Sequence, residues 1–378
     1  MSAAHKDDQV LDLGSEKYSD YHSAILLASV ALTAFAGAAA AEVSFSGSAT
    51  VGNLNGYTAG SSDTTTDGMY WDADLGVSMS QELDNGITAA ASFTILIADG
   101  NNGNTDLDTD EDFVLSLSSD MGSLSFGDVE FAAVSAWKSA GDMATDGFRE
   151  VDDESVLKGE VSFGSVTAAV AYVADSTVTT DSLTDLSAAV TADLGAATAV
   201  VAFQEETADQ DEMFGISVAT SLSGVDLTVA YSSNNTTDKD STGIKAVYTI
   251  DAVKLTGFYV AESDQEDGYG LTVDYTAGAL KAQAFFANVN DLDETRLQGS
   301  YDLGNGLVLT AGTIDGDSNT DGDFANYIVA EYDLGGGASL MASYADLNND
   351  GATAYNDIDT FGGYELNAGT TLEVSFAF

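Results

Sequence analysis

The sequence predicts an all-β protein, a closed transmembrane barrel of antiparallel strands with one long loop folded into it. Three observations support this. From Glu42 to Phe378, apolar and polar residues alternate with a period of two. The alternating segments have roughly nine or ten residues, the length of a tilted strand that crosses a bilayer. Aromatic residues end these segments on the apolar face, and basic residues fall on the polar face.

Composition excludes several other classes of protein. The chain has 378 residues, a formal net charge of −52, no proline and no cysteine. Without cysteine, neither disulfides nor thiol chemistry can operate. Such acidity argues against a nucleic-acid partner, whose phosphates would be repelled. The regular apolar period argues against disorder.

Residues 1–41 are predicted to be an N-terminal extension followed by a signal peptide. An apolar run from Ala24 ends in small residues at Ala39 and Ala41, which is typical of a secretory cleavage site. The acidic residues before this run depart from that pattern, and a transmembrane helix is the alternative reading. We expect cleavage after Ala41, so that the mature barrel comprises residues 42–378 and lacks both histidines, His5 and His22.

The strands follow in chain order, joined alternately by short turns and longer polar stretches. This sorting is typical of outer-membrane barrels. With both termini on the periplasmic side the strand number must be even, and the pattern accommodates as many as 20 strands. The expected strands lie near 43–51, 71–79, 87–97, 113–117, 122–127, 156–163, 165–174, 183–194, 196–204, 212–222, 224–232, 241–250, 252–261, 267–276, 278–287, 294–303, 306–314, 323–334, 337–346 and 370–378.

The stretch from Asp128 to Ser155 has neither a two-residue nor a helical apolar period. A connection of this length without its own structure is usually functional. It contains Trp137, Phe131 and Phe148 among many carboxylates, and a fully solvated loop has no use for such aromatics. The sequence therefore predicts a loop that folds into the barrel and narrows it; a long surface loop is the alternative.

Aromatic residues mark both ends of the predicted strands. They have the same parity as the apolar residues of their own strands, which means that they lie on the same face. This is expected for girdles of aromatics at the lipid headgroups. The residues before long loops are Tyr172, Phe203, Tyr231, Tyr259, Phe286 and Tyr344, and those before short turns are Tyr248, Tyr275, Tyr301 and Tyr332.

Basic residues fall on the other parity. A Lys or Arg facing lipid at mid-membrane costs roughly 2–4 kcal/mol, so these side chains are expected to face the barrel interior. An ordinary solvated sheet face gives the same parity. The residues are Lys158, Lys245, Lys254, Lys281 and Arg296.

Four segments resemble the Gram-negative general porins, most closely their alphaproteobacterial (Rhodobacter-like) branch. They read Ala41-Glu42-Val-Ser-Phe-Ser-Gly47, Gly122-Ser-Leu-Ser-Phe-Gly-Asp-Val129, Tyr332-Asp-Leu-Gly-Gly-Gly-Ala-Ser339 and Leu372-Glu-Val-Ser-Phe-Ala-Phe378. The resemblance implies a homotrimer of 16-stranded barrels in outer-membrane lipid, with calcium in acidic loops. It also implies that the loop after Gly127-Asp128 constricts the pore and that Phe378 belongs to the signal read by the outer-membrane assembly machinery.

Enzymatic chemistry is not expected. The mature chain lacks histidine and cysteine, which excludes Ser-His-Asp triads, cysteine nucleophiles and histidine metal sites. One acidic stretch spaces its oxygen ligands as calcium loops do, but it lacks the Gly and Glu of an EF-hand, and a solvated acidic loop is the alternative. Its candidate ligands are Asp315, Asp317, Asn319, Asp321 and Asp323.

These features predict an outer-membrane channel for passive diffusion of small hydrophilic solutes, with a preference for cations. A secreted calcium-binding β-protein or adhesin and a substrate-specific channel are the alternatives. The candidate acidic lining of the constriction is Asp142, Asp146, Glu150, Asp152 and Asp153, alongside the loop bases Lys138 and Arg149. The bases expected on the facing wall are Lys158, Lys245 and Arg296.

Overall fold

The computed structural model describes residues 41–55, 68–100, 108–109, 113–149, 154–174, 184–205, 211–315, 324–348, 357–359 and 363–378. The predicted leader, residues 1–40, lies outside these ranges. Within the described ranges, no helix is long and apolar enough to cross a membrane.

Antiparallel strands form one closed ring. Each strand pairs with its neighbour in the chain, and the last strand returns to the first, Val51 opposing Val374. The first half of the wall comprises β1 (Glu42–Asn55), β2 (Gly68–Glu82), β3 (Thr88–Asp99), β5 (Val114–Ser119), β6 (Gly122–Gly127), β7 (Val156–Phe163), β8 (Val166–Val173), β9 (Thr184–Asp193), β10 (Ala197–Glu205) and β11 (Glu212–Leu222). The second half comprises β12 (Val225–Asn234), β13 (Lys239–Ile250), β14 (Val253–Glu262), β15 (Gly268–Ala277), β16 (Leu280–Val289), β17 (Leu292–Gly304), β18 (Leu307–Asp315), β19 (Phe324–Gly335), β20 (Ala338–Asn348) and β23 (Gly369–Ala377).

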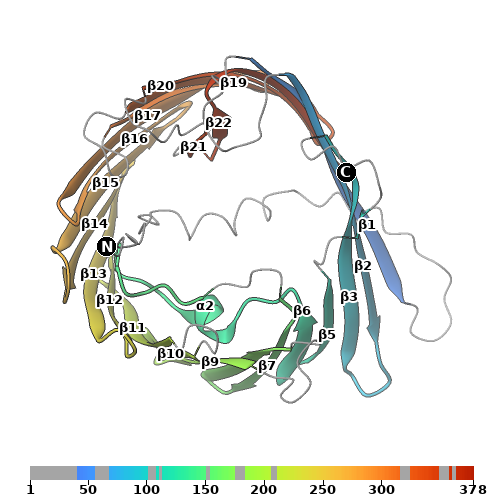
Figure 1. The fold of residues 1–378 in the computed structure, drawn as a ribbon, viewed down its shortest axis with the longest axis vertical. Helices are drawn as coiled ribbons and strands as arrows, with labels where there is room; N and C mark the ends of the chain where they lie inside the picture. The colour runs from blue at the N-terminus through green and yellow to red at the C-terminus, as the bar shows by residue number, and fades with distance from the viewer. Residues whose placement is uncertain are drawn as a thin grey trace, which may run out of the picture.

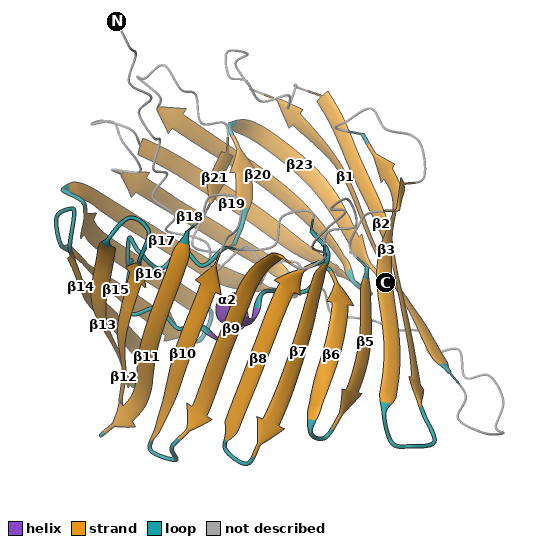
Figure 2. Cartoon of the chain, turned by 60° about the horizontal axis from the view of Figure 1, so that its bottom comes forward, coloured by secondary structure: helices purple, strands orange, loops and turns teal. Residues whose placement is uncertain are grey.

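The barrel has 20 strands, and a short β4 (Asp108–Thr109) adds to the edge of β3. The even number and the count of up to 20 are confirmed. The value of 16 taken from the family resemblance is wrong for this chain, because 20 separate alternating segments are long enough to pair. Figure 2 shows the tilted strands, with the short turns after β2, β5, β7 and β9 gathered at one rim.

Residue parity sorts the two faces of the wall as predicted. Eight of the ten predicted girdle aromatics are exposed on the outer surface, while Tyr172 and Phe203 are half-buried. The exposed side chains on one level are Tyr231, Tyr259, Phe286 and Tyr344, and those on the other are Tyr248, Tyr275, Tyr301 and Tyr332. Exposed aliphatic residues such as Val229 and Leu297 lie between these levels. An apolar belt bounded by aromatics is the surface that a bilayer solvates.

Among the described residues, two segments lie inside the ring (Figure 1). The first contains α2 (Ala132–Ala136) and belongs to the long connection between β6 and β7. The second is a small hairpin of β21 (Asp357–Asp359) and β22 (Glu365–Asn367), which pair with each other apart from the wall. The sequence predicts the first, whereas the second lies between the expected strands 337–346 and 370–378, where no strand was expected.

Candidate functional site

The connection 128–155, called the inner loop from here on, begins against an apolar part of the wall. Phe131 is fully buried and packs with Val156, Ala171 and Val173 on the inward face of β7 and β8. The backbone N–H of Ala133 donates to the buried Ser187 hydroxyl at 2.9 Å. The loop is therefore attached to the inside of the barrel within its first turn.

Trp137 and Phe148 form the apolar centre of the inner loop. Their ring centroids are 5.3 Å apart, and Phe148 packs with Ala202 and Met213 of β10 and β11. A side chain on Gly215 would overlap the indole of Trp137, so glycine makes room for the ring at this point. Trp137 and Phe148, two of the three aromatics that predicted a packed loop, thus both contact the wall.

The middle of the inner loop lies against β12, β13 and β14. Ala140 is fully buried with Ala230 and Val260, and its carbonyl passes so close to Gly243 that a Cβ there would overlap it. At Gly141, φ is +108°, a conformation that favours glycine, and the ring of Phe258 lies directly beneath. Backbone contacts this close leave no room for water between loop and wall.

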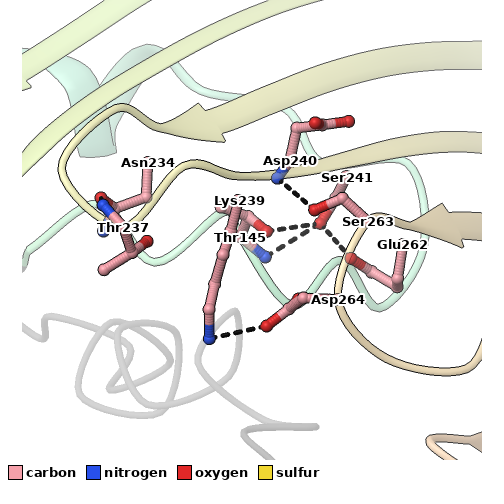
Figure 3. Close-up of polar contacts among 9 residues, drawn as sticks. All are labelled: Thr145, Asn234, Thr237, Lys239, Asp240, Ser241, Glu262, Ser263 and Asp264. Atoms are coloured by element: carbon pink, nitrogen blue, oxygen red, sulfur yellow. Dashed lines mark hydrogen bonds and ion pairs between the residues drawn. The ribbon is translucent and has the colours of Figure 1, made fainter.

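A buried network fixes the next residues (Figure 3). The Ser241 hydroxyl accepts from the Thr145 N–H at 3.0 Å and lies 2.8 Å from the Thr145 hydroxyl. It also bonds to one carboxylate oxygen of Glu262, whose other oxygen accepts from the Ala144 N–H at 2.9 Å. Ser241 and Glu262 were not predicted as site residues, since parity indicates only that they face inward.

Asp146 lies next to this network with its carboxyl largely removed from solvent. Burial raises the pKa of Asp146 to about 7, and the negative charges of Asp142 and Glu262 act in the same direction. The Ser139 hydroxyl and the Trp137 indole lie close enough to oppose part of this rise. Two of the predicted acids, Asp142 and Asp146, are therefore brought together on the inner loop.

Arg149 closes the described part of the inner loop. Its guanidinium donates to Asp185 of β9 at 2.9 Å and also pairs with Glu154, while Gln204 donates to its backbone carbonyl at 3.0 Å. Arg149 thus holds the loop to the wall rather than presenting a free cation. The three acids that follow it in the prediction, Glu150, Asp152 and Asp153, lie outside the described residues.

Two of the three bases predicted for the wall facing the loop, Lys158 and Lys245, lie on the loop's own side of the barrel. Lys158 lies beside the loop and donates to the Ser135 hydroxyl at 2.7 Å. Lys245 directly opposes Phe258 in the β13–β14 register, on the arc that the loop covers. Lys138 is exposed on the loop itself. The expectation for Lys158 and Lys245 was wrong because parity gives the face of a strand and not its position around a ring.

Arg296 lies on β17, away from the arc that carries the inner loop. Its guanidinium pairs with Glu294 and stands over the ring of Phe285, 5.6 Å from the centroid. Among the predicted calcium ligands, Asp315 ends β18, whereas Asp317, Asn319, Asp321 and Asp323 lie outside the described residues. Within the described part of the chain, no three carboxylates, histidines or cysteines gather as a metal site.

Comparison with known proteins identifies the family to which this barrel belongs. A family model described as Gram-negative porin matches residues 28–296. The chain belongs to the Gram-negative porin family. The predicted family is confirmed, and membership places the porin in the outer membrane and points to a channel. An outer-membrane porin also replaces the alternative of a secreted soluble β-protein.

Solved structures give weaker likenesses to the porin. A mutant of the Rh. blastica porin is 14% identical, with 89% of this chain and 100% of that chain covered and a TM-score of 0.43. A triple mutant of the Rhodopseudomonas blastica porin is 16% identical, with 90% and 100% covered and a TM-score of 0.39. None of the curated proteins matches the chain.

Proposed function

We propose that the porin is a passive diffusion channel that prefers cations and that the inner loop forms its constriction. The observation that carries this proposal is the attachment of the inner loop to the inward side of the wall. Ser187 and Ser241 bond to its backbone, and Gly243 lets Ala140 approach the wall. A loop held inside a barrel at several points along its length narrows the path for solutes.

Charge supports the cation preference. The chain has 62 acidic and 10 basic residues. Several bases facing the interior are offset by a carboxylate of their own: Arg149 by Asp185 and Glu154, Lys254 by Asp274 at 3.7 Å, and Arg296 by Glu294. Bases that are already paired oppose the field of the remaining carboxylates only weakly, and a narrow low-dielectric channel focuses that field on passing ions.

The test of the constriction is removal of the inner loop. In a variant lacking about Ala140 to Glu150, we expect higher single-channel conductance and entry of larger sugars in liposome-swelling assays. Ser300→Val, on the inward face of β17 away from the loop, is the matched control and should leave both values unchanged. Unchanged conductance after the deletion, with the barrel still assembled, would contradict the proposal.

We propose that the porin assembles as a homotrimer in outer-membrane lipid. The family resemblance and the exposed apolar belt support this. The chain ends with Phe378 exposed and its backbone paired with Gly47 in both directions, at 2.6 and 2.9 Å. Such an aromatic end supports recognition by the assembly machinery. An oligomer that survives unheated detergent electrophoresis is the expected result, and a detergent-free monomer would contradict it.

A calcium ion in the acidic stretch 315–323 is also proposed, supported by ligand spacing alone. Removal of calcium by a chelator should lower the melting temperature of the assembled porin, and added calcium should restore it. If the chelator has no effect, the stretch is a solvated acidic loop.

A further inference from the structure

The β21–β22 hairpin occupies the barrel interior on a different arc from the inner loop. Figure 1 shows it beside β19 and β20, across the ring from α2. The pairs Asp357–Asn367 and Asp359–Glu365 close a two-stranded sheet of its own. The described part of the chain therefore enters the interior after β6 and again between β20 and β23.

Leu366 anchors the hairpin to the wall. Its side chain is 1% exposed and packs with Ile314, Val329 and Ala345. These residues face inward, since Ile328, the neighbour of Val329 in the chain, is 51% exposed on the outer surface. A leucine fully buried on the inward face of a barrel requires that the hairpin be docked there.

Tyr364 makes a second, polar anchor. Its hydroxyl donates to a carboxylate oxygen of Glu331 at 2.6 Å, and its ring packs beside the cluster around Leu366. Below them, Tyr327 lies along the wall, passes close over Gly312 and donates to Gln298 at 2.5 Å. The hairpin thus rests on a surface formed by β18, β19 and β20.

The residue types on the inward face of the wall also indicate where the inner loop and the hairpin are docked. Inward positions of a water-filled barrel are normally polar, yet they are apolar in two arcs. On β8 they are Ala169, Ala171 and Val173, under the inner loop. On β19 they include Ala325 and Val329, under the hairpin. Inward positions on β17, between the arcs, are Glu294, Arg296, Gln298 and Ser300. Apolar inward residues therefore mark the covered arcs.

We propose that the β21–β22 hairpin is a second constriction element, held by Leu366 and Tyr364, that narrows the channel from the side facing the inner loop. The sequence from 349 to 369 contains Asp350, Asp357, Asp359 and Glu365 but no lysine or arginine. The segment between β20 and β23 therefore has a net negative charge. This part of the inference rests on the proposed cation-preferring channel and assigns small cations as the solutes that the hairpin favours.

The first test releases the anchors. In the double variant Tyr364→Phe and Leu366→Ser, we expect higher single-channel conductance than in the wild type. Leu297→Ser is the matched control. Leu297 is 55% exposed on the outer surface, so this variant also replaces a leucine but does not touch the hairpin. Wild-type conductance in the double variant, with normal assembly, would count against the hairpin as a constriction.

The second test leaves both anchors, Leu366 and Tyr364, unchanged. Because the chain has no cysteine, Asp359→Cys creates a single reactive thiol. After its modification by a trimethylammonium methanethiosulfonate, we expect lower single-channel conductance and a reversal potential shifted toward anions. In the control variant Leu297→Cys, whose thiol faces lipid, the same treatment should change neither the conductance nor the reversal potential. No change in the Asp359→Cys channel after modification confirmed by mass spectrometry would overturn the inference.

The results expected from these experiments differ according to whether the second constriction or the proposed channel function is wrong. A wild-type protein without channel activity would contradict the proposed function itself. A channel that responds to deletion of the inner loop but to neither hairpin variant would contradict the second constriction alone.

Discussion

At the scale of single residues, Gly243 tests how closely the inner loop is held. A Cβ at this position would overlap the Ala140 carbonyl. A backbone carbonyl cannot move aside by a rotamer change, as a side chain can. Gly243→Ala should therefore destabilise loop docking by about 1–3 kcal/mol, as overpacking does in cores. We expect noisier open-channel currents and raised conductance. Gly257→Ala is the control, since its Cβ would meet nothing closer than 3.8 Å; equal behaviour of both variants would refute the close approach.

Asp146 makes docking of the inner loop depend on pH. Burial and the charges of Asp142 and Glu262 raise the pKa of Asp146 from 3.8 to about 7, so the docked loop retains a proton that a released loop gives up. Docking is then strongest below about pH 4 and weakens as pH rises to about 7. Wild-type conductance should increase between about pH 4 and about pH 7, and Asp146→Asn should flatten this increase. The same increase in both proteins would rule out Asp146 as the titrating group.

The candidate site could be predicted from single residues only in part. Trp137, Phe131 and Phe148 indicated that the inner loop is packed, because large aromatics in an acidic loop need an apolar surface. The pairing of Arg149 with Asp185 could not be predicted, since these residues lie 36 positions apart and meet only once the ring has closed. The same limitation led to the wrong expectation for Lys158 and Lys245.

At the scale of elements, β17 provides a direct test of the two faces. Leu297 faces outward in the middle of the strand, and Ser300 faces inward three residues later. Leu297→Arg should destabilise the folded barrel by roughly 2–4 kcal/mol, the cost of a cation facing lipid. Ser300→Arg should cost much less. Urea titrations of protein refolded in lipid vesicles measure both, and equal costs would contradict the assignment of faces.

The strands were largely predictable, and the hairpin was not. Alternation with a period of two specified the barrel strands because every one of them has one face toward lipid and the other toward the barrel interior. The hairpin has three residues in each strand, too few to show a period. An available signal was β19, where Ala325 and Val329 are apolar on the parity that should face water. Apolar residues on both faces of a barrel strand indicate an inward element above it.

At the scale of the whole molecule, two properties define the channel. Twenty strands make a wider ring than the family resemblance implied, since barrel diameter grows with strand number. Segments docked on opposite arcs then reduce the open path. Carboxylates outnumber bases in the chain, 62 to 10, and the resulting field acts on ions wherever the path is narrow.

The reversal potential of the purified porin across a planar bilayer, under a KCl gradient at neutral pH, tests this account most directly. We predict cation preference that is strong in dilute KCl and weak in concentrated KCl, because the Debye length falls from about 10 Å at 0.1 M to about 3 Å at 1 M. Acidification toward the reference carboxylate pKa near 4 should reduce the preference. Anion preference in dilute salt at neutral pH would contradict the account, since the basic residues would then dominate the field along the path.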